Sequence, residues 1–417
     1  MNTLKAAVIG LGGFAHAHHD ALRVLESQGE LQVIATCDPN IEKFAASPLL
    51  AGLEARGVPV YRDYREMLAA HASELDFVTI PTPIPLHAPM HRACVEAGVA
   101  VYLEKPPTLD IRELDSMIEV EHSARFQTQV GFNFIIEATR QSLKARLLAG
   151  EFGALKRAIF VGTHPRSESY FRRAPWAGRL RSNGHLILDS CIGNALAHQI
   201  HNLLFWCGEG ELLSWGEIGA VEAELYRAHS IENFDTVFAR AGCGRTQIWV
   251  GATHTGVGPA TQHEILECDH ARLLYAGGTY QILWHDGRQE TGPTDTEATS
   301  SILVRNLRYF AHYLSGHYSR PLTTLADSRP FVALNDLILI AAARITTIPD
   351  SFVTHKSGAN SEIFRIVEAI PPALELFLGS GRFPSETGIE WAKAGGTAHP
   401  AQITQLDEVV NTLIESP

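Results

Sequence analysis

The chain has 417 residues, of which 45% are hydrophobic and 19% charged, and its formal net charge is -12. This composition is typical of a folded globular protein with two or three domains, and the negative charge argues against nucleic acid or an anionic membrane surface as a partner. Six cysteines stand singly without a CxxC pair, which favours reduced thiols over a disulfide framework or a zinc site. No segment has the length of a membrane span and no signal-peptide pattern opens the chain, so we expect a cytoplasmic protein.

The first predicted elements form a site for a dinucleotide. The apolar run 6–9 predicts a buried strand, and Gly10-Leu11-Gly12-Gly13-Phe14-Ala15 follows it and leads into a helix over about 15–25. Bare backbone amides and a helix N-terminus together bind a pyrophosphate. We expect the dinucleotide on Gly10, Gly12, Gly13, Phe14 and Ala15.

Asp38 directly follows the second predicted strand, 31–37. A carboxylate at this position accepts hydrogen bonds from the adenosine ribose. It would repel a 2′-phosphate and no arginine follows closely, so NAD is favoured over NADP. The alternative is an Asp-Pro turn after an ordinary strand. His16, His18 and His19 lack a matching set of Cys or carboxylate ligands, so we expect no metal site.

Helices and strands then alternate. Helices are predicted over 66–72, 87–97 and 111–124, and strands over 76–80, 100–103 and 126–132. This alternation predicts a doubly wound parallel sheet and a first domain over 1–132. The strand 100–103 stops at Glu104-Lys105-Pro106-Pro107, at the sheet edge where ligands bind. Lys105 is therefore a candidate for chemistry, and the Lys105–Pro106 bond is a candidate cis peptide.

The second part of the chain has a different pattern. A helix up to about 148 precedes predicted strands over 155–163, 212–229, 234–241, 246–252, 264–268, 272–275 and 280–284, and short turns between several of them predict an antiparallel sheet. Helices are predicted in the later part of 186–206 and over 302–314 and 327–345. These elements indicate an α+β domain over 133–348 for substrate binding and oligomerisation, followed by a helical extension over 349–417 with helices near 361–378 and 406–414. Helices on one side would leave an apolar sheet face, so we expect a homodimer or homotetramer.

The loop over 163–181 is unusually cationic and aromatic for an acidic protein. It contains Arg166, Tyr170, Arg173 and Trp176. Arginine forks and aromatic faces suit a polyol, a sugar acid or a phosphorylated sugar. The same residues would also suit the cofactor's pyrophosphate or an ordinary set of surface ion pairs.

The chain resembles the Gfo/Idh/MocA oxidoreductases, the family of glucose–fructose oxidoreductase and inositol dehydrogenase. The resemblance rests on six motifs: Gly10–Ala15 with His18, Asp38, Thr82-Pro83 with His87, Glu104-Lys105-Pro106, Val130-Gly131-Phe132-Asn133, and Leu325-Ala326-Asp327. It implies that Thr82, Pro83, His87, Glu104, Lys105 and Asn133 surround the dinucleotide. It also implies that Lys105 points at the reacting carbon of the substrate.

The family's other catalytic pair is an Asp and a His four residues apart. The matching positions here are Asn194 and His198, and Asp189 just upstream is an alternative source of the carboxylate. A histidine with a pKa near neutrality suits the removal of a hydroxyl proton. The alternative for His198 is a helical histidine packed against the sheet.

The resemblance therefore implies an NAD-dependent dehydrogenase that oxidises a secondary hydroxyl of a sugar, sugar acid or cyclitol. Lys105 and His198 would be its acid–base pair and would contact the substrate. Two alternatives remain open: an NAD-dependent glycoside hydrolase or lyase, and a non-catalytic regulator that senses a dinucleotide or sugar.

Overall fold

The computed structural model describes residues 3–295, 299–358 and 361–415, and the chain forms two compact units. The first comprises Met1–Thr108, Arg112–Ile136 and Glu297–Arg329, and the second comprises Leu109–Ile111, Glu137–Thr296 and Pro330–Pro417. This division differs from the three expected domains in two ways. Residues 297–329 belong to the first unit, and the expected extension beyond 348 belongs to the second.

The first unit contains the expected parallel sheet. Its strands are β1 (Leu4–Ile9), β2 (Leu31–Cys37), β3 (Val60–Tyr61), β4 (Phe77–Ile80), β5 (Ala100–Leu103) and β6 (Gln129–Val130). They lie in the order β3-β2-β1-β4-β5-β6, and every pairing between them is parallel. The strand order reverses between β1 and β4, at the position where doubly wound sheets bind their ligands. The doubly wound fold is confirmed.

The last strand is shorter than the predicted run 126–132. The amide of Gln127 donates to the hydroxyl of Tyr313 at 3.0 Å, and the amide of Thr128 donates to Glu121 at 2.6 Å. These amides are therefore used by side chains and not by the strand ladder.

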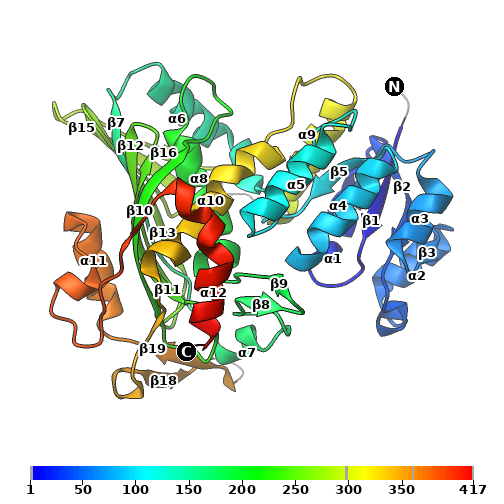
Figure 1. The fold of residues 1–417 in the computed structure, drawn as a ribbon. Helices are drawn as coiled ribbons and strands as arrows, with labels where there is room; N and C mark the ends of the chain where they lie inside the picture. Colours follow the sequence, from blue (N-terminus) through cyan, green and yellow to red (C-terminus); the bar gives the residue numbers. More distant parts are fainter. Residues whose placement is uncertain (1–2, 296–298, 359–360, 416–417) are drawn as a thin grey trace. The chain divides into compact units, whose positions relative to one another are not determined.

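Helices connect the strands of the first unit (Figure 1). They are α1 (Ala15–Ser27), α2 (Pro48–Ala55), α3 (Tyr64–His71), α4 (His87–Glu96) and α5 (Ile111–Glu121). A helix from much later in the chain, α9 (Thr299–Leu314), packs against α1. Its Leu303, Leu307 and Phe310 are buried in the same apolar cluster as Leu22 and Leu25 of α1. This shared core is why residues 297–329 belong to the first unit.

The second unit is built on a large, mostly antiparallel sheet, as expected. Its main strands are β7 (Leu155–Thr163), β10 (Ile218–Arg227), β11 (Thr236–Cys243), β12 (Thr246–Thr253), β13 (Thr261–Cys268), β14 (Ala271–Ala276), β15 (Thr279–Trp284) and β16 (Gln289–Pro293). The order is β16-β15-β14-β13-β7-β12-β11-β10, followed by the short strand β17 (Thr346–Thr347). The pairings of β7 with β12 and of β10 with β17 are parallel.

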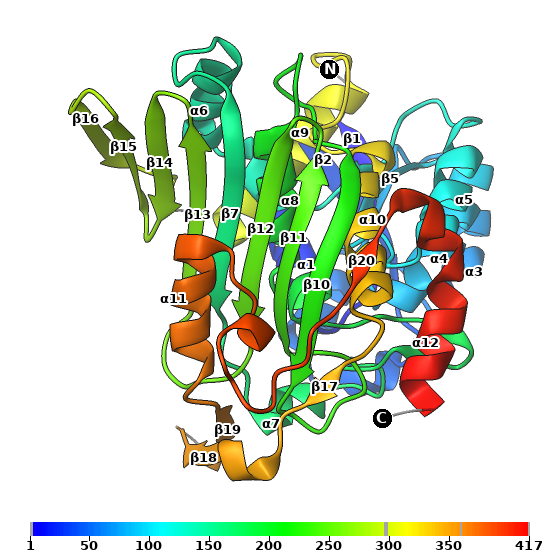
Figure 2. The same cartoon turned by 60° about the vertical axis from the view of Figure 1, so that its left-hand side comes forward.

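Both faces of this sheet carry helices. On one face α8 (Ala197–Cys207) contacts β7 and β12, and on the other α11 (Ile370–Ser380) contacts the same strands. Figure 2 shows α11 lying across the front of the sheet. Leu374 and Phe377 of α11 are buried in one cluster with Ile159, Phe238 and Trp249 of the sheet. The chain's own C-terminal segment thus covers the part of the sheet that was expected to face another subunit.

The predicted helix over 361–378 is wrong in its first half. Residues 363–366 form the strand β19 (Ile363–Ile366), which pairs with β18 (Thr354–Ser357), and the helix α11 begins only at Ile370. The alternation Ile-Phe-Arg-Ile suits a strand, and Pro371 and Pro372 fit the first turn of a helix. The predicted helix at 406–414 is confirmed as α12 (Leu406–Glu415).

Within the described residues, no helix combines the length and the apolar character that crossing a bilayer requires. The same residues contain no group of three or more His, Cys, Asp or Glu side chains arranged to hold a metal ion.

Candidate active site

The glycine loop after β1 presents backbone where side chains would block a ligand. Gly10 has φ +121°, and a Cβ there would lie 3.3 Å from Cβ of Ala15. A Cβ on Gly12 would lie 2.9 Å from Cζ of Phe44, whereas one on Gly13 would meet nothing within 4 Å. The loop is therefore closely packed behind Gly12 and open at Gly13, and Phe14 beside it is 42% exposed. This geometry suits the approach of a pyrophosphate to bare amides.

Asp38 is fixed beside this loop. One carboxylate oxygen accepts the amide of Leu11 at 3.0 Å, and the other accepts the amide of Asn40 at 2.8 Å. The two bonds hold the carboxylate at the end of β2, next to the glycine loop. A carboxylate with this placement has lone pairs left for the hydroxyls of a ribose.

Glu104 is buried and hydrogen-bonds to both α1 and the backbone of Lys105. It is 5% exposed, and its Oε1 lies 3.0 Å from Nε2 of the fully buried His18 on α1. A Cβ on Gly131 would come within 2.8 Å of the same oxygen, so a larger residue at position 131 would displace the Glu104 carboxylate. The other carboxylate oxygen accepts the amide of Lys105 at 3.2 Å. Glu104 thus fixes the backbone of Lys105 to α1, and His18 is a site residue that its motif alone did not explain.

His87 fixes the other side of the same strand end. Its Nε2 lies 2.8 Å from the carbonyl oxygen of Thr82, and its Nδ1 lies 2.9 Å from that of Pro106. The carboxyl ends of β4 and β5 are thereby tied together. Burial lowers the pKa of His87, although its backbone contacts oppose the shift. The Lys105–Pro106 bond is cis, as predicted, and Lys105 itself is only half-buried.

The remaining predicted cofactor residues also lie in the first unit. Asn133 is 3% exposed, and its side-chain oxygen accepts the hydroxyl of Tyr102 at 2.8 Å. The hydroxyl of Thr82 contacts the sulfur of Met90 at 3.4 Å, and Pro83 follows directly. Asn133 and Thr82 therefore hold the sheet edge in shape as well as bordering it.

In the second unit, Asp189 and Asn194 form a pair. The side-chain amide of Asn194 donates to Asp189 at 2.9 Å, and the other carboxylate oxygen of Asp189 accepts the amide of Gly178 at 2.6 Å. Asp189 is 4% exposed. The two residues weighed as alternatives for one role are therefore in direct contact.

Asn194 and His198 do not lie on one continuous helix. Asn194 belongs to a π-helical turn, Cys191–Ala195, and His198 lies in the first turn of α8. Leu196 between them has a non-helical backbone with φ -108° and ψ 19°. The regular spacing of four residues expected for one helix face is interrupted here. His198 is half-buried.

The four predicted substrate residues of the cationic loop form one stack. The guanidinium carbon of Arg173 lies 3.7 Å from the ring centre of Tyr170 and 4.9 Å from that of Trp176, and that of Arg166 lies 4.2 Å from the Tyr170 ring. Arg173 also reaches Asp189, at 3.7 Å. The cationic loop and the Asp189–Asn194 pair are thus neighbours within the second unit.

A buried polar cluster beneath this loop was missed by sequence reasoning. Nδ1 of His229 lies 2.7 Å from Asp235, and its Nε2 lies 3.1 Å from the carbonyl oxygen of Arg166. Burial opposes ionisation of Asp235, but its bonds to His229 and to backbone amides prevail and lower its pKa. The pair is six positions apart in the sequence, and no motif marks it.

The first unit thus has a doubly wound sheet with a glycine loop, and the second has a mostly antiparallel sheet bearing a cationic loop. Residues 4–132 match the family model described as the oxidoreductase family with an NAD-binding Rossmann fold. This part of the chain is therefore similar to the NAD-binding domain of the Gfo/Idh/MocA oxidoreductases, in agreement with the resemblance seen in the sequence.

Two curated relatives are dehydrogenases by name. The chain is 31% identical over 149 residues to D-apiose dehydrogenase from Paraburkholderia graminis. The aligned region covers 36% of this chain and 37% of that protein. The chain is also 32% identical over 151 residues to inositol 2-dehydrogenase 4 from Saccharopolyspora erythraea. Here the aligned region covers 36% of this chain and 42% of that protein. Each match spans less than half the length of the relative.

Solved structures share the fold over more of the chain. One is an oxidoreductase from Agrobacterium radiobacter, solved in complex with NAD+, L-tartaric acid and magnesium. Its TM-score is 0.66 at 17% identity, and the superposed region covers 82% of this chain and 97% of that chain. The WlbA dehydrogenase from Bordetella pertussis, in complex with NADH and UDP-GlcNAcA, has a TM-score of 0.64 at 19% identity and covers 80% of this chain and 94% of its own.

Proposed function

We propose that the protein is an NAD-dependent oxidoreductase that transfers hydride between a secondary hydroxyl of a sugar, sugar acid or cyclitol and the nicotinamide. The observation that carries the proposal is the placement of Lys105. It stands half-buried at the carboxyl end of β5, its backbone amide is held by Glu104, and the carbonyl of the next residue, Pro106, contacts His87. Dehydrogenase names among the matched relatives support the same reaction class.

The residues at the switch point of the first unit fit NAD. The bare amides of the glycine loop suit its pyrophosphate, and the fixed carboxylate of Asp38 suits its adenosine ribose. When bound, the nicotinamide supplies the acceptor for the hydride. Asp38 disfavours a 2′-phosphate by charge repulsion, which favours NAD over NADP.

Lys105 and His198 would divide the proton chemistry. Oxidation of a secondary alcohol releases a hydride from carbon and a proton from oxygen. His198, as a neutral imidazole, would accept the hydroxyl proton, and the Lys105 ammonium would orient and polarise the oxygen as it becomes a carbonyl. Asn194 and Asp189 would act together: the carboxylate orients the amide, and the amide positions the hydroxyl or His198.

The other readings have less support. A hydrolase or lyase would recycle its cofactor, and a sensing regulator would not need the fixed lysine. The relatives described above are named dehydrogenases, so neither reading is favoured.

The test combines a substrate panel with matched variants. Purified protein with NAD+ and a panel of neutral sugars, sugar acids, sugar phosphates and cyclitols should release NADH into solution with at least one compound. On that compound, Lys105→Met and His198→Ala should each lower kcat by about 10²–10⁴-fold while NAD binding, measured by calorimetry, is retained.

Two exposed residues provide controls. Lys156→Met and His122→Ala remove the same groups at surface positions with side chains 60% and 70% exposed, and both should keep wild-type turnover. A protein that binds NAD but reduces it with no compound of the panel, or a His198→Ala variant with full turnover, would contradict the proposal.

A further inference from the structure

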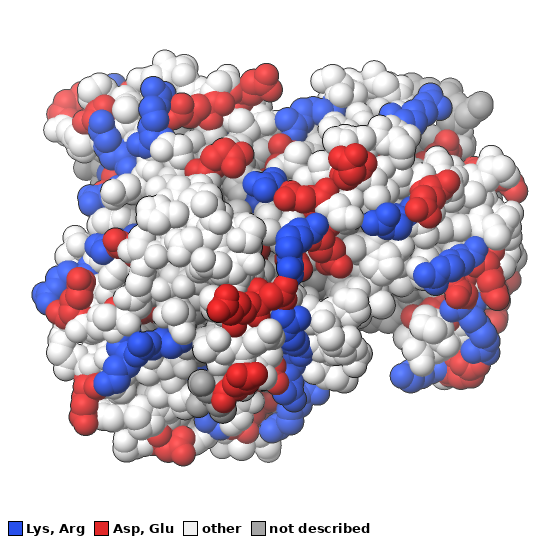
Figure 3. Space-filling view, in the orientation of Figure 1, with Lys and Arg blue, Asp and Glu red and all other residues white. Residues whose placement is uncertain are grey.

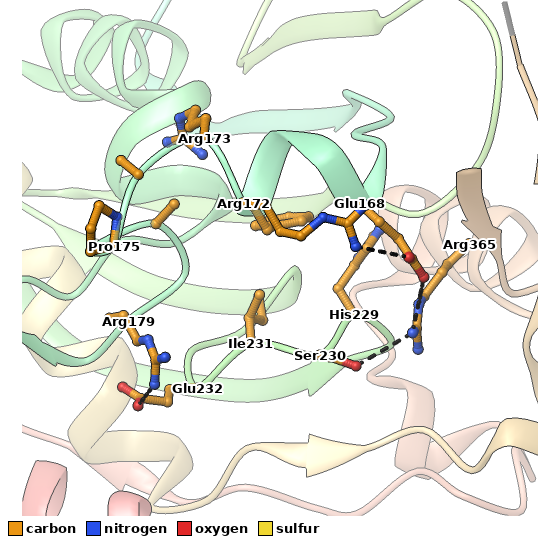
Figure 4. A pocket seen from close by; sticks show the side chains of 13 residues that line it. Glu168, Arg172, Arg173, Pro175, Arg179, His229, Ser230, Ile231, Glu232 and Arg365 are labelled. Atoms are coloured by element: carbon orange, nitrogen blue, oxygen red, sulfur yellow. Dashed lines mark hydrogen bonds and ion pairs between the residues drawn. The ribbon is translucent and has the colours of Figure 1, made fainter. Parts of the chain in front are cut away.

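A cavity lies beside the cationic loop, with all its lining residues in the second unit. Its volume is about 740 Å³, which is within the range of small-molecule sites. Figure 4 shows its wall, formed by α7 (Glu168–Phe171) and the turn after it, residues 229–232, and one side chain from β19. The arginine and glutamate residues in its lining are Glu168, Arg172, Arg173, Arg179, Glu232 and Arg365.

The cavity is cationic in an acidic protein. Its lining includes four arginines and two glutamates, so the formal charge of these side chains is +2, against -12 for the whole chain. Lys and Arg side chains also gather on the surface over α7, at the lower centre of Figure 3. A concave site with this charge attracts anions.

The two carboxylates do not use all the donors that the arginines offer. Arg179 pairs with Glu232. Arg365 lies 3.1 Å from Glu168 and donates to the carbonyl oxygen of Ala228 at 2.6 Å. Arg172 reaches Glu168 only at 3.5 Å, with a side chain that is 71% exposed. Each guanidinium carries five N–H donors. Arg172 can therefore turn toward a ligand, and Glu168 stays paired because Arg365 also contacts it.

Arg173 connects the cavity to the candidate active site. It lines the cavity, donates to the carbonyl oxygen of Tyr170 at 2.7 Å and lies 3.7 Å from Asp189, which in turn holds Asn194. A ligand with one end in the cavity would therefore extend toward the Asp189–Asn194 pair.

We propose that this cavity binds an oxyanion group of the substrate, a carboxylate or a phosphate, so that the enzyme acts on sugar acids or sugar phosphates and not on neutral sugars. Arg172 and Arg173 contact the oxyanion, and Arg365, which approaches the same Glu168 carboxylate as Arg172, forms part of the wall. The inference rests on the proposed function for the position of the reacting carbon, but the binding of the anion does not depend on turnover.

The C-terminal segment completes this site. Arg365 lies on β19, a strand held against α7 by a backbone bridge between Ser167 and Phe364. The hydroxyl of Ser169 also donates to Glu362 at 2.7 Å. The side chain of Arg365 is only 15% exposed, so its position in the cavity wall is fixed by the packing around it.

Calorimetric titration of the full chain with inorganic phosphate and with D-glucuronate tests the inference. Saturating NAD is present so that the glycine loop is occupied, and D-glucose is the neutral match. At least one of the two anions should bind the wild-type protein, and D-glucose should bind more than tenfold more weakly. Arg172→Ala should weaken binding of the anion about tenfold, the loss expected for one charge-assisted contact of about 1.4 kcal/mol. Which anion responds distinguishes a carboxylate from a phosphate.

The controls separate this inference from the proposed function. Arg245→Ala removes an arginine that is 86% exposed and outside the cavity, and it should change the affinity less than twofold. With an acid substrate, Arg172→Ala should raise KM and leave kcat nearly unchanged. Absence of binding by both anions, or unchanged affinity in Arg172→Ala, would overturn the inference. Anion binding without NADH formation would keep the cavity assignment and refute the dehydrogenase.

Discussion

Gly131 decides whether Glu104 can hold Lys105. A methyl group at Gly131 would come within 2.8 Å of Oε1 of Glu104, and the displaced carboxylate would lose its contact with His18. Gly131→Ala should therefore lower the free energy of unfolding by about 1–3 kcal/mol and reduce turnover. Urea unfolding and NADH formation measure the two effects.

A second glycine offers a matched control for this change. Gly52 lies on α2 with nothing within 4 Å of a Cβ and no strained backbone. Gly52→Ala should therefore stabilise the protein by about 0.4–1 kcal/mol. Equal stability of the two alanine variants would show that Glu104 is not constrained by Gly131.

Asp38 sets the cofactor preference through its charge. Asp38→Asn keeps an oxygen for the amide of Leu11 or Asn40 and removes the negative charge. The ratio of NADP to NAD affinity should rise about tenfold, the scale of one exposed charge contact, and binding titrations with each dinucleotide would measure it. Asp20→Asn, at an exposed position on α1, should leave the ratio unchanged. Wild-type protein that binds NADP as tightly as NAD would refute the assignment.

At the scale of elements, Lys144 holds the end of the helix that carries His198. It is fully buried on α6 (Ala138–Leu148), and its ammonium donates to the carbonyl oxygens of Phe205 at 2.6 Å and Trp206 at 3.1 Å, and to that of Gly208. These are the unsatisfied carbonyls at the C-terminus of α8. A positive charge there is also favoured by the helix dipole.

Lys144→Met should therefore leave buried carbonyls without donors and lower the free energy of unfolding by about 1–3 kcal/mol. Chemical denaturation would measure the loss. Lys156→Met, at a position that is 60% exposed, should be nearly neutral. A Lys144→Met variant as stable as the wild type would show that water replaces the ammonium.

The sequence predicted elements well where periodicity and turn residues agree. The strands at 31–37 and 155–163 were predicted at their observed bounds. The hydrogen bond between Asp189 and Asn194 could not be predicted from periodicity. It forms because a π-helical turn brings together two side chains that the sequence analysis weighed as alternatives. Arg365 was not accessible either, because its contact with Glu168 joins positions 197 residues apart, and short-range patterns carry no information on such contacts.

At the scale of the whole molecule, buried histidines make stability depend on pH. Burial lowers the pKa of His91 in the first unit to about 4 and that of His254 in the second to about 3. The ordinary value of 6.5 is regained on unfolding, so the unfolded chain binds more protons between these limits. The free energy of unfolding should therefore be largest above pH 6.5 and fall as the pH is lowered toward 4, by about 1.4 kcal/mol per pH unit for each such histidine.

Urea unfolding at pH 7, 6 and 5 would measure this slope. His254→Gln should flatten it, and His122→Gln, at a position that is 70% exposed, should not. A free energy of unfolding that stays constant between pH 6.5 and 5 would rule out the two histidines as the source.

Assembly into a homodimer or homotetramer remains a prediction, but its physical basis has changed. The sheet face under α11 is already covered by Leu374 and Phe377, so that part of the sheet is not available to another subunit. Light scattering at micromolar concentration would measure the mass of the particle.

The position of α9 also has a consequence for how the chain is made. Its apolar side chains close the core of the first unit, yet about 160 residues separate the end of Arg112–Ile136 from the start of Glu297–Arg329. At a synthesis rate of about 5–20 residues per second, the ribosome takes roughly 10–30 s to cross that gap. During this time the nascent first unit exposes Leu22 and Leu25 of α1, a surface on which a chaperone would act, and a fragment that ends at residue 136 would keep it exposed permanently.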